Sequence, residues 1–206
     1  MLCIRARLQS IRLQKKIKIV AVPFSINDKD GIKAALDCDV IFSCVDRPWP
    51  RFTLDCFSLS NLIPVIDGGI DASINEKGDN IDQARWKTHV VAPGRACMQC
   101  VGQYVPEDVA LEQSGLLKDP TYIKGLPKDH WTKRGENVFA FSLALAGLLM
   151  QQFLSLMLQP RGLYYGPKEY DFNSGNIDND FAFSCMPNCR ICTTEASGDK
   201  TNIPLI

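Results

Sequence analysis

The chain has 206 residues, in which 23 basic and 23 acidic side chains cancel to a formal charge of zero. This length predicts one large domain, or one and a half smaller ones. A broad nucleic-acid-binding face needs an excess of Lys and Arg, so the charge balance argues against nucleic acid as a partner. Residues 1–18 are interrupted too often by Arg and Lys to form a secretory signal, so we expect a cytoplasmic protein.

Short apolar runs alternate with helical patterns between residues 17 and 70. In chain order the pattern predicts a strand at 17–22, a helix at 30–37, a buried strand at 40–45, a helix at 48–61, and a strand at 64–66 that leaves through a tight turn at 67–69. Such a series is typical of a parallel sheet with helices on its faces, and ligands bind at the carboxyl ends of its strands. Asp46 and Asp67 each follow a predicted strand end.

The second half of the chain is less regular. The pattern predicts turns at 75–79, a strand at 86–91, a connection rich in Pro and Gly at 104–135, a long helix at 138–158, and a hairpin at 163–172 and 180–183. The long helix has no charged residue and is long enough to cross a bilayer. Because Gln151 and Gln152 lie near its middle, we favour a buried or subunit-interface helix and expect no membrane span. An interface helix implies a homodimer.

Two cysteine pairs share one spacing: Cys97-Met98-Gln99-Cys100 and Cys189-Arg190-Ile191-Cys192. Each Cys-x-x-Cys turn presents two sulfurs on one side of a tight knuckle, and two knuckles complete a tetrahedral shell. The sequence therefore predicts a zinc site whose ligands are Cys97, Cys100, Cys189 and Cys192. With four thiolates the shell is closed, so we expect a structural staple and not a catalyst.

Other interpretations of these cysteines stay open. A redox dithiol or a disulfide is one, and unpaired buried thiols are another. Cys185 lies four residues before Cys189 and is an alternative ligand, although the repeated spacing favours Cys189. The two histidines, His89 and His130, share no helical face with another candidate ligand, so we expect both to be structural or solvated.

A resemblance to a known family rests on these features together. Residues 39–51 have the sequence DVIFSCVDRPWPR, a predicted strand follows at 63–69, and the two cysteine pairs come later. This arrangement resembles the ThiF/MoeB family, which shares the adenylation fold of ubiquitin-activating enzymes. In that family an apolar strand ends in an aspartate, an arginine follows on the next helix, and two Cys-x-x-Cys pairs bind structural zinc. The resemblance covers residues 17–192.

The resemblance implies an α/β fold, with a partial doubly wound (Rossmann-like) sheet followed by a zinc-stapled crossover and a C-terminal hairpin. It implies a single adenylation domain over residues 1–206, with a Rossmann-like half at 17–92 and a zinc-linked part at 93–193. Family members use ATP and magnesium to adenylate the C-terminal glycine carboxylate of a ubiquitin-like protein or peptide, which would be the partner here.

Two residues match functional positions of the family. Asp46 matches the strand-end aspartate and would bind magnesium and ATP, and Arg51 matches the helix arginine and would add positive charge at the α-phosphate. From the residues alone, Asp46 could instead cap the following helix, and Arg51 could be a solvated helix residue.

The chain also departs from the family pattern. It begins near the family's second or third strand and contains neither Gly-x-Gly-x-x-Gly nor Gly-x-x-x-x-Gly-Lys-Ser/Thr. We therefore expect an N-terminally incomplete domain without ATP turnover of its own. Arg47 stands where the family commonly has asparagine. No cysteine lies between Cys100 and Cys185, which favours adenylation without a covalent thioester.

Two non-enzymatic hypotheses remain beside this one. The first is a zinc-stabilised scaffold that binds a ubiquitin-like or homologous partner through an open sheet edge. The second is a zinc-ribbon nucleic-acid binder, which the zero net charge and the wide separation of the knuckles disfavour.

Overall fold

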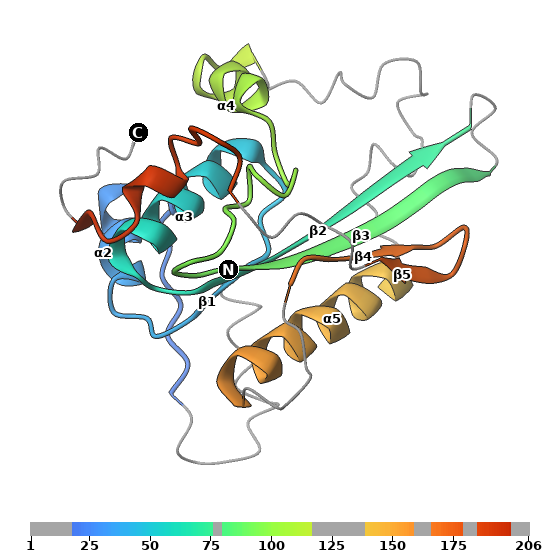
Figure 1. The fold of residues 1–206 in the computed structure, drawn as a ribbon, viewed down its shortest axis with the longest axis horizontal. Coiled ribbons are helices and arrows are strands. Elements are labelled where there is room, and N and C mark those ends of the chain that lie inside the picture. Colours follow the sequence, from blue (N-terminus) through green and yellow to red (C-terminus); the bar gives the residue numbers. More distant parts are fainter. Residues whose placement is uncertain (1–17, 76–79, 117–138, 159–165, 179–184, 199–206) are drawn as a thin grey trace.

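The computed structural model describes residues 18–75, 80–116, 139–158, 166–178 and 185–198, which contain a five-stranded sheet with helices on both faces (Figure 1). The helices are α2 (Lys29–Ala35), α3 (Pro48–Asn61), α4 (Pro106–Gln113) and α5 (Phe139–Leu158), and a short 3-10 helix, η4, spans Cys192–Thr194. The strands are β1 (Ile41–Ser43), β2 (Val65–Ile74), β3 (Ile81–Val91), β4 (Lys168–Asp171) and β5 (Asn176–Asp178).

The order of the strands in the sheet follows their order in the chain, with β1 and β5 at its edges. β1 and β2 are parallel and are joined through α3, which is the strand, helix, strand unit that the sequence predicts. The pairs β2/β3, β3/β4 and β4/β5 are antiparallel. The α/β class is confirmed with a mixed sheet, whereas a doubly wound, Rossmann-like sheet stays a prediction.

The predicted tight turn at residues 67–69 is wrong, because β2 runs straight through it to Ile74. The two glycines serve helix packing instead. A Cβ atom on Gly68 would lie 2.9 Å from Leu149 Cδ2 of α5, and one on Gly69 would lie 2.7 Å from Arg51 Nη2 of α3. Successive strand residues face opposite sides of a sheet, so Gly68 and Gly69 admit a helix to each face.

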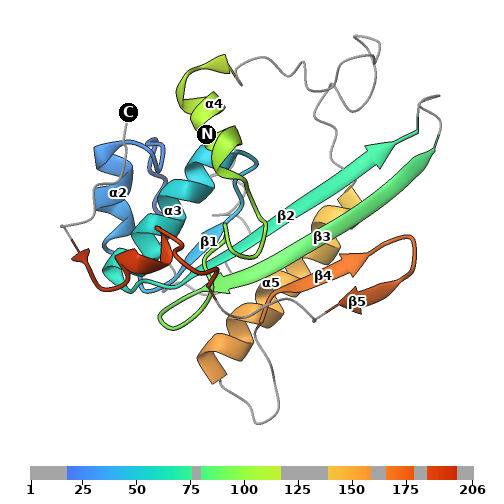
Figure 2. The ribbon, with the colours of Figure 1, turned by 45° about the horizontal axis from the view of Figure 1, so that its top comes forward.

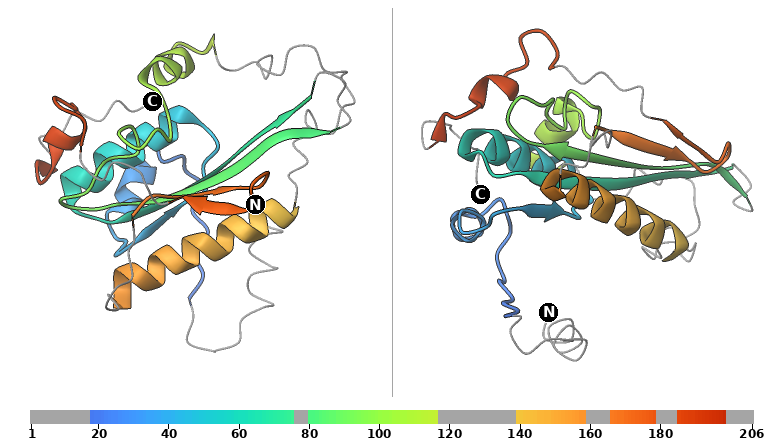
Figure 3. Two further views of the ribbon diagram at one scale, coloured as in Figure 1. Left: turned by 45° about the vertical axis from the view of Figure 1, so that its right-hand side comes forward. Right: turned by 60° about the horizontal axis from the view of Figure 1, so that its bottom comes forward.

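Helices α3 and α5 lie on opposite faces of the sheet (Figures 2 and 3), and each face has its own core. On one face Val65 and Val91 pack with Leu54 and Leu59 of α3. On the other face lies α5, which covers two neighbouring clusters. They contain Ile66, Val90, Ala92 and Leu149, and Ala84, Trp86, Phe141 and Leu148. The alternation along the two strands places Ile66 and Val90 under α5 and Val65 and Val91 on the side of α3.

Other predicted elements differ from the structure in their bounds. The helix at 48–61 is α3 without a shift, and the long helix is α5, with residue 138 outside the described residues. Residues 18–22 lie in no strand, so the described part of the predicted strand at 17–22 is wrong. β3 begins at Ile81 and not at residue 86. The hairpin turns earlier than predicted, between β4 and β5, and residues 163–165 and 180–183 lie outside the described residues.

Helix α4 was not predicted, since it falls within the supposed loop at 104–135. The sequence nevertheless contains a helix-start pattern here, because Pro106, Glu107 and Asp108 form the first turn of α4. Proline and acidic residues are typical of the first turn of a helix.

Candidate metal centre

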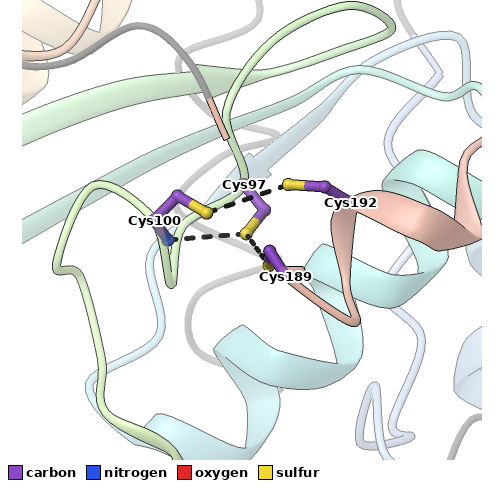
Figure 4. A group of neighbouring side chains, drawn as sticks. All are labelled: Cys97, Cys100, Cys189 and Cys192. Carbon is purple, nitrogen blue, oxygen red and sulfur yellow. Dashed lines mark hydrogen bonds between the residues drawn. The ribbon is translucent and has the colours of Figure 1, made fainter. Parts of the chain in front are cut away.

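The four cysteines of the two knuckles converge on one point (Figure 4). Their sulfur atoms all lie within 4.8 Å of one another. Cys97 Sγ is 3.6 Å from Cys189 Sγ, and Cys100 Sγ is 3.8 Å from Cys192 Sγ. A tetrahedral zinc ion with Zn–S bonds of about 2.3 Å places its sulfurs about 3.8 Å apart. The sulfur geometry therefore fits a metal ion such as zinc, and no disulfide joins these four residues.

The first knuckle is held by a buried carboxylate that the sequence analysis missed. Asp55 on α3 accepts hydrogen bonds from the backbone N–H of Met98 at 2.8 Å, from that of Gln99 at 3.2 Å, and from the Tyr104 hydroxyl at 2.9 Å. Its side chain is fully buried, and burial raises its pKa to about 7 although these hydrogen bonds act to lower it. The carboxyl thus fixes the two residues between Cys97 and Cys100.

The second knuckle follows Asn188, whose φ of 62° is left-handed. Ile191 packs into the α3-side core, and the Ala196 N–H donates to the Leu59 carbonyl of α3 at 2.9 Å. In the chain this knuckle follows the hairpin of β4 and β5, and the residues that join them, 179–184, lie outside the described residues. Both knuckles thus rest on one helix, α3.

Backbone N–H groups point at the sulfurs, as is favourable for thiolates. The Cys100 N–H donates to Cys97 Sγ at 3.4 Å, and the Met186 N–H donates to Cys100 Sγ at 3.2 Å. Burial raises the pKa of the Cys97 and Cys192 thiols, so a metal must displace their protons when it binds. Binding is therefore expected to weaken as the pH falls.

Cys185 lies beside this cluster but outside it. Its sulfur is exposed and lies 3.8 Å from the Arg95 carbonyl oxygen, and it does not belong to the group of four. The repeated spacing thus selects the more buried Cys189, as expected.

The carboxylate of Asp46 is exposed and takes no part in capping α3. The N-cap position belongs to Arg47, whose side chain makes no capping hydrogen bond. Instead, Glu112 of α4 accepts from the Trp49 N–H at 2.8 Å, and its other oxygen lies 3.7 Å from Arg47 Nη1. The alternative of Asp46 as a helix cap is therefore wrong, because Glu112 satisfies the first turn of α3.

Arg51 is bound to a different carboxylate. Its Nε lies 3.4 Å from Asp67 Oδ2, and its side chain is only 12% exposed. Asp67 is itself fully buried and also accepts from the Ser43 hydroxyl, so it is not the accessible strand-end ligand that we expected. Burial raises the pKa of Asp67, and the Arg51 guanidinium and the Ser43 hydroxyl oppose that shift. A solvated Arg51 is excluded, and its role at a phosphate stays a prediction.

His89 is structural, as expected. It is buried on β3, and its Nε2–H donates to the Ala96 carbonyl at 2.7 Å, just before the first knuckle. Burial lowers the pKa of His89 to about 4, so the ring is neutral at pH 7. His130 lies outside the described residues.

Comparison with known proteins does not assign this chain to a family. No family model matches the sequence, and no curated protein matches it. The cysteine cluster, which could hold a metal ion, is therefore the site on which a functional proposal can be built.

One helix in the described part of the chain, α5, is long and apolar enough to cross a membrane. A third of its most apolar window is buried against the rest of the protein. Core helices of soluble proteins often have the same length and composition, so this observation is weak evidence for a span.

Proposed function

We propose that this chain is a ThiF-type adenylation module in which one structural zinc ion, held by the four cysteines, fastens both knuckles to α3. The sulfur spacing supports a zinc ion, and the closed set of four thiolates leaves no position for a substrate. In this proposal the zinc ion stabilises the fold, and adenylation takes place at a different site, near Asp46.

The observation that carries the catalytic part of the proposal is the exposed carboxylate of Asp46. Asp46 follows β1, a strand at the edge of the described sheet. It does not cap α3, because Glu112 accepts the hydrogen bond from the first turn of that helix. In this proposal Asp46 binds magnesium and orients Mg·ATP toward the C-terminal carboxylate of a ubiquitin-like protein or peptide. Magnesium would supply positive charge that reduces the repulsion between the attacking carboxylate and the α-phosphate of ATP.

The sequence contains no glycine-rich phosphate loop, so the proposal needs that loop from a second polypeptide segment. Exchange of pyrophosphate into ATP, measured with the purified chain alone, is expected to be absent. Adding in trans a ThiF-type segment that contains the loop, together with a ubiquitin-like protein ending in glycine, is expected to give exchange.

Two substitutions test the role of Asp46 in this complemented reaction. Asp46→Asn is expected to lower exchange by at least about 100-fold, because the metal loses its anionic ligand. Asp39→Asn is the matched control, since it removes the same charge from an exposed residue before the amino end of β1. Exchange that survives Asp46→Asn, or that Asp39→Asn lowers equally, contradicts the catalytic proposal.

A second candidate is a zinc-stabilised scaffold that binds a ubiquitin-like or homologous partner without chemistry. The ion pair between Arg51 and Asp67 favours it, because it holds the expected phosphate-binding arginine against a buried carboxylate. The exposed edge of β1, where Phe42 is 41% exposed, is a surface for such a partner. Retention of the ubiquitin-like protein on the immobilised chain, with no adenylate formed even after complementation, would support the scaffold.

A further inference from the structure

A fifth sulfur lies beside the four-cysteine site without belonging to it. Cys185 is exposed, and its Sγ lies 3.8 Å from the Arg95 carbonyl oxygen, which is a weak contact for a thiol. The next residue in the chain, Met186, donates its backbone N–H to Cys100 Sγ at 3.2 Å. The exposed thiol of Cys185 is therefore one residue away from a direct contact with a proposed zinc ligand.

Cys192 is the ligand that meets this exposed thiol. Burial raises the pKa of the Cys192 thiol, and a hydrogen bond with the Cys185 side chain raises it further. Cys192 and Cys100 are only partly buried, and their sulfurs lie 3.8 Å apart, whereas Cys97 and Cys189 are buried (Figure 4). Cys192 thus belongs to the group of four and also contacts the thiol outside it.

The two cysteines lie close together in the chain as well. Both belong to the described segment 185–198, so a covalent bond between them would close a short loop within that segment. Such a bond would use the sulfur of Cys192, which the proposed zinc ion also needs. A disulfide between Cys185 and Cys192 and a complete shell of four thiolates therefore exclude each other.

We propose that Cys185 and Cys192 form a disulfide when the protein meets hydrogen peroxide, and that the zinc ion leaves its site as this bond forms. The inference rests on the zinc ion of the proposed function, and it is independent of the adenylation chemistry. Cys185 would react first, because it is exposed and is not one of the four ligands.

The reaction has two steps. The Cys185 sulfur attacks one peroxide oxygen, the O–O bond breaks, and a sulfenic acid and water form. The Cys192 thiolate then leaves the zinc ion and attacks the Cys185 sulfur, so that the S–S bond forms and the S–O bond breaks. The departing hydroxide takes a proton from solvent and becomes the second water. Two electrons pass from the sulfurs to the peroxide.

The new bond would not replace the link that the zinc ion provides. In the zinc-loaded protein the metal joins the first knuckle to the second, whereas the disulfide lies within the segment of the second knuckle alone. Ile191, which packs into the α3-side core next to Cys192, would lose that link to the first knuckle. The oxidised protein is therefore expected to unfold at a lower urea concentration than the reduced, zinc-loaded protein.

The first test measures zinc release from the full, zinc-loaded chain with the chromogenic chelator 4-(2-pyridylazo)resorcinol while hydrogen peroxide is added. Cys185→Ser is expected to slow the release at least about tenfold. Cys38→Ser is the matched control, because Cys38 is also exposed and its Sγ also contacts a backbone carbonyl, that of Ala34 at 3.7 Å; it is expected to release zinc like the parent protein. Equal rates for Cys185→Ser and the parent would overturn the proposal.

The second test identifies the bond. Trypsin cleaves after Arg190 and so separates Cys185 from Cys192, and the disulfide is expected to join the two peptides in mass spectrometry. Fragment ions that place the bond at Cys189 instead of Cys185, or the absence of any linked pair, would overturn the pairing. Dithiothreitol and added zinc are expected to restore the site, since dithiothreitol reduces a disulfide but not a sulfinic acid.

The two tests also separate this inference from the proposals on which it builds. A purified protein without zinc contradicts the metal centre and, with it, the release of zinc. The linked peptides then decide the pairing of Cys185 with Cys192 alone, which their presence supports and their absence overturns. A failure of pyrophosphate exchange changes neither measurement, because neither uses ATP.

Discussion

At the scale of single residues, two buried polar side chains, Asp55 and His89, hold the backbone on either side of Cys97 in place. Asp55 fixes the turn between Cys97 and Cys100, and His89 fixes the Ala96 carbonyl just before it. These hydrogen bonds join both side chains to the backbone in or beside the first knuckle and not to a sulfur atom, so both would act on a bound metal through the backbone. Support of this kind commonly tunes metal affinity.

Replacing Asp55 with alanine removes the acceptor for three donors, of which the Met98 N–H and the Tyr104 hydroxyl are buried. We expect the free energy of unfolding of the zinc-loaded protein to fall by about 3 kcal/mol. Asp55→Asn keeps one acceptor oxygen and is expected to cost less. Urea unfolding followed by circular dichroism measures both, and equal stability of Asp55→Ala and the parent protein would contradict the assigned role.

His89 is expected to make the protein sensitive to acid. Its pKa is about 4 in the folded protein against 6.5 for a fully solvated histidine, so the unfolded chain binds the extra proton first as the pH falls. Its contribution to stability is therefore complete above pH 6.5 and shrinks below it, by about 2 kcal/mol at pH 5.

The matched variant for this test is His89→Gln, which retains an N–H donor for the Ala96 carbonyl but does not titrate. Urea unfolding of both proteins at pH 7 and pH 5 separates the His89 effect from that of Asp55 and the cysteines, which both proteins share. Parallel stability curves for the two proteins would show that His89 is not the titrating group.

At the scale of elements, the sequence predicted α3 and α5 well because each has a long helical pattern that tertiary contacts do not contradict. It failed where a residue's role depends on a distant element. Gly68 and Gly69 look like a turn in the sequence, but packing against α5 and α3 makes them strand residues. Likewise, only the fold brings Glu112 of α4 to the start of α3 and so excludes Asp46 as the cap.

Gly68 offers a test of the packing between α5 and the sheet. Gly68→Val is expected to lower the free energy of unfolding by about 2 kcal/mol, because its side chain would overlap Leu149 and Leu145. Ala72→Val is the control, since Ala72 lies on the same face of β2 and is exposed. Urea unfolding at one protein concentration compares the two, and a tolerated Gly68→Val would show that α5 is free to shift.

At the scale of the whole molecule, the spacing of the four cysteines predicted their convergence, since Cys-x-x-Cys turns have few other uses in pairs. A hairpin was predicted near β4 and β5, but the antiparallel pairing of β2 with β3 and of β3 with β4 was not predictable in the same way. Strand direction depends on which strands meet, and neither the eleven residues of β3 nor the four mostly charged residues of β4 contain information about direction.

Metal analysis tests the proposed zinc staple. Protein purified under reducing conditions is expected to contain one zinc ion per chain, measured by plasma mass spectrometry. Cys97→Ser and Cys189→Ser are each expected to lose the metal, whereas Cys185→Ser is expected to retain it, because Cys185 lies outside the group of four. Metal lost from Cys185→Ser but kept in Cys189→Ser would reassign the fourth ligand.

The separation of the two knuckles has a consequence for biosynthesis. Cys97 and Cys189 are 92 residues apart, so the first knuckle leaves the ribosome long before its counterpart exists. Closing a loop of this size costs about 4–5 kcal/mol in chain entropy, which the proposed metal ion would offset only at the end of translation. Until then the core around Leu59 and Met98 stays uncovered by Ile191, so a shortage of metal would expose apolar surface to chaperones and proteases in the newly made chain.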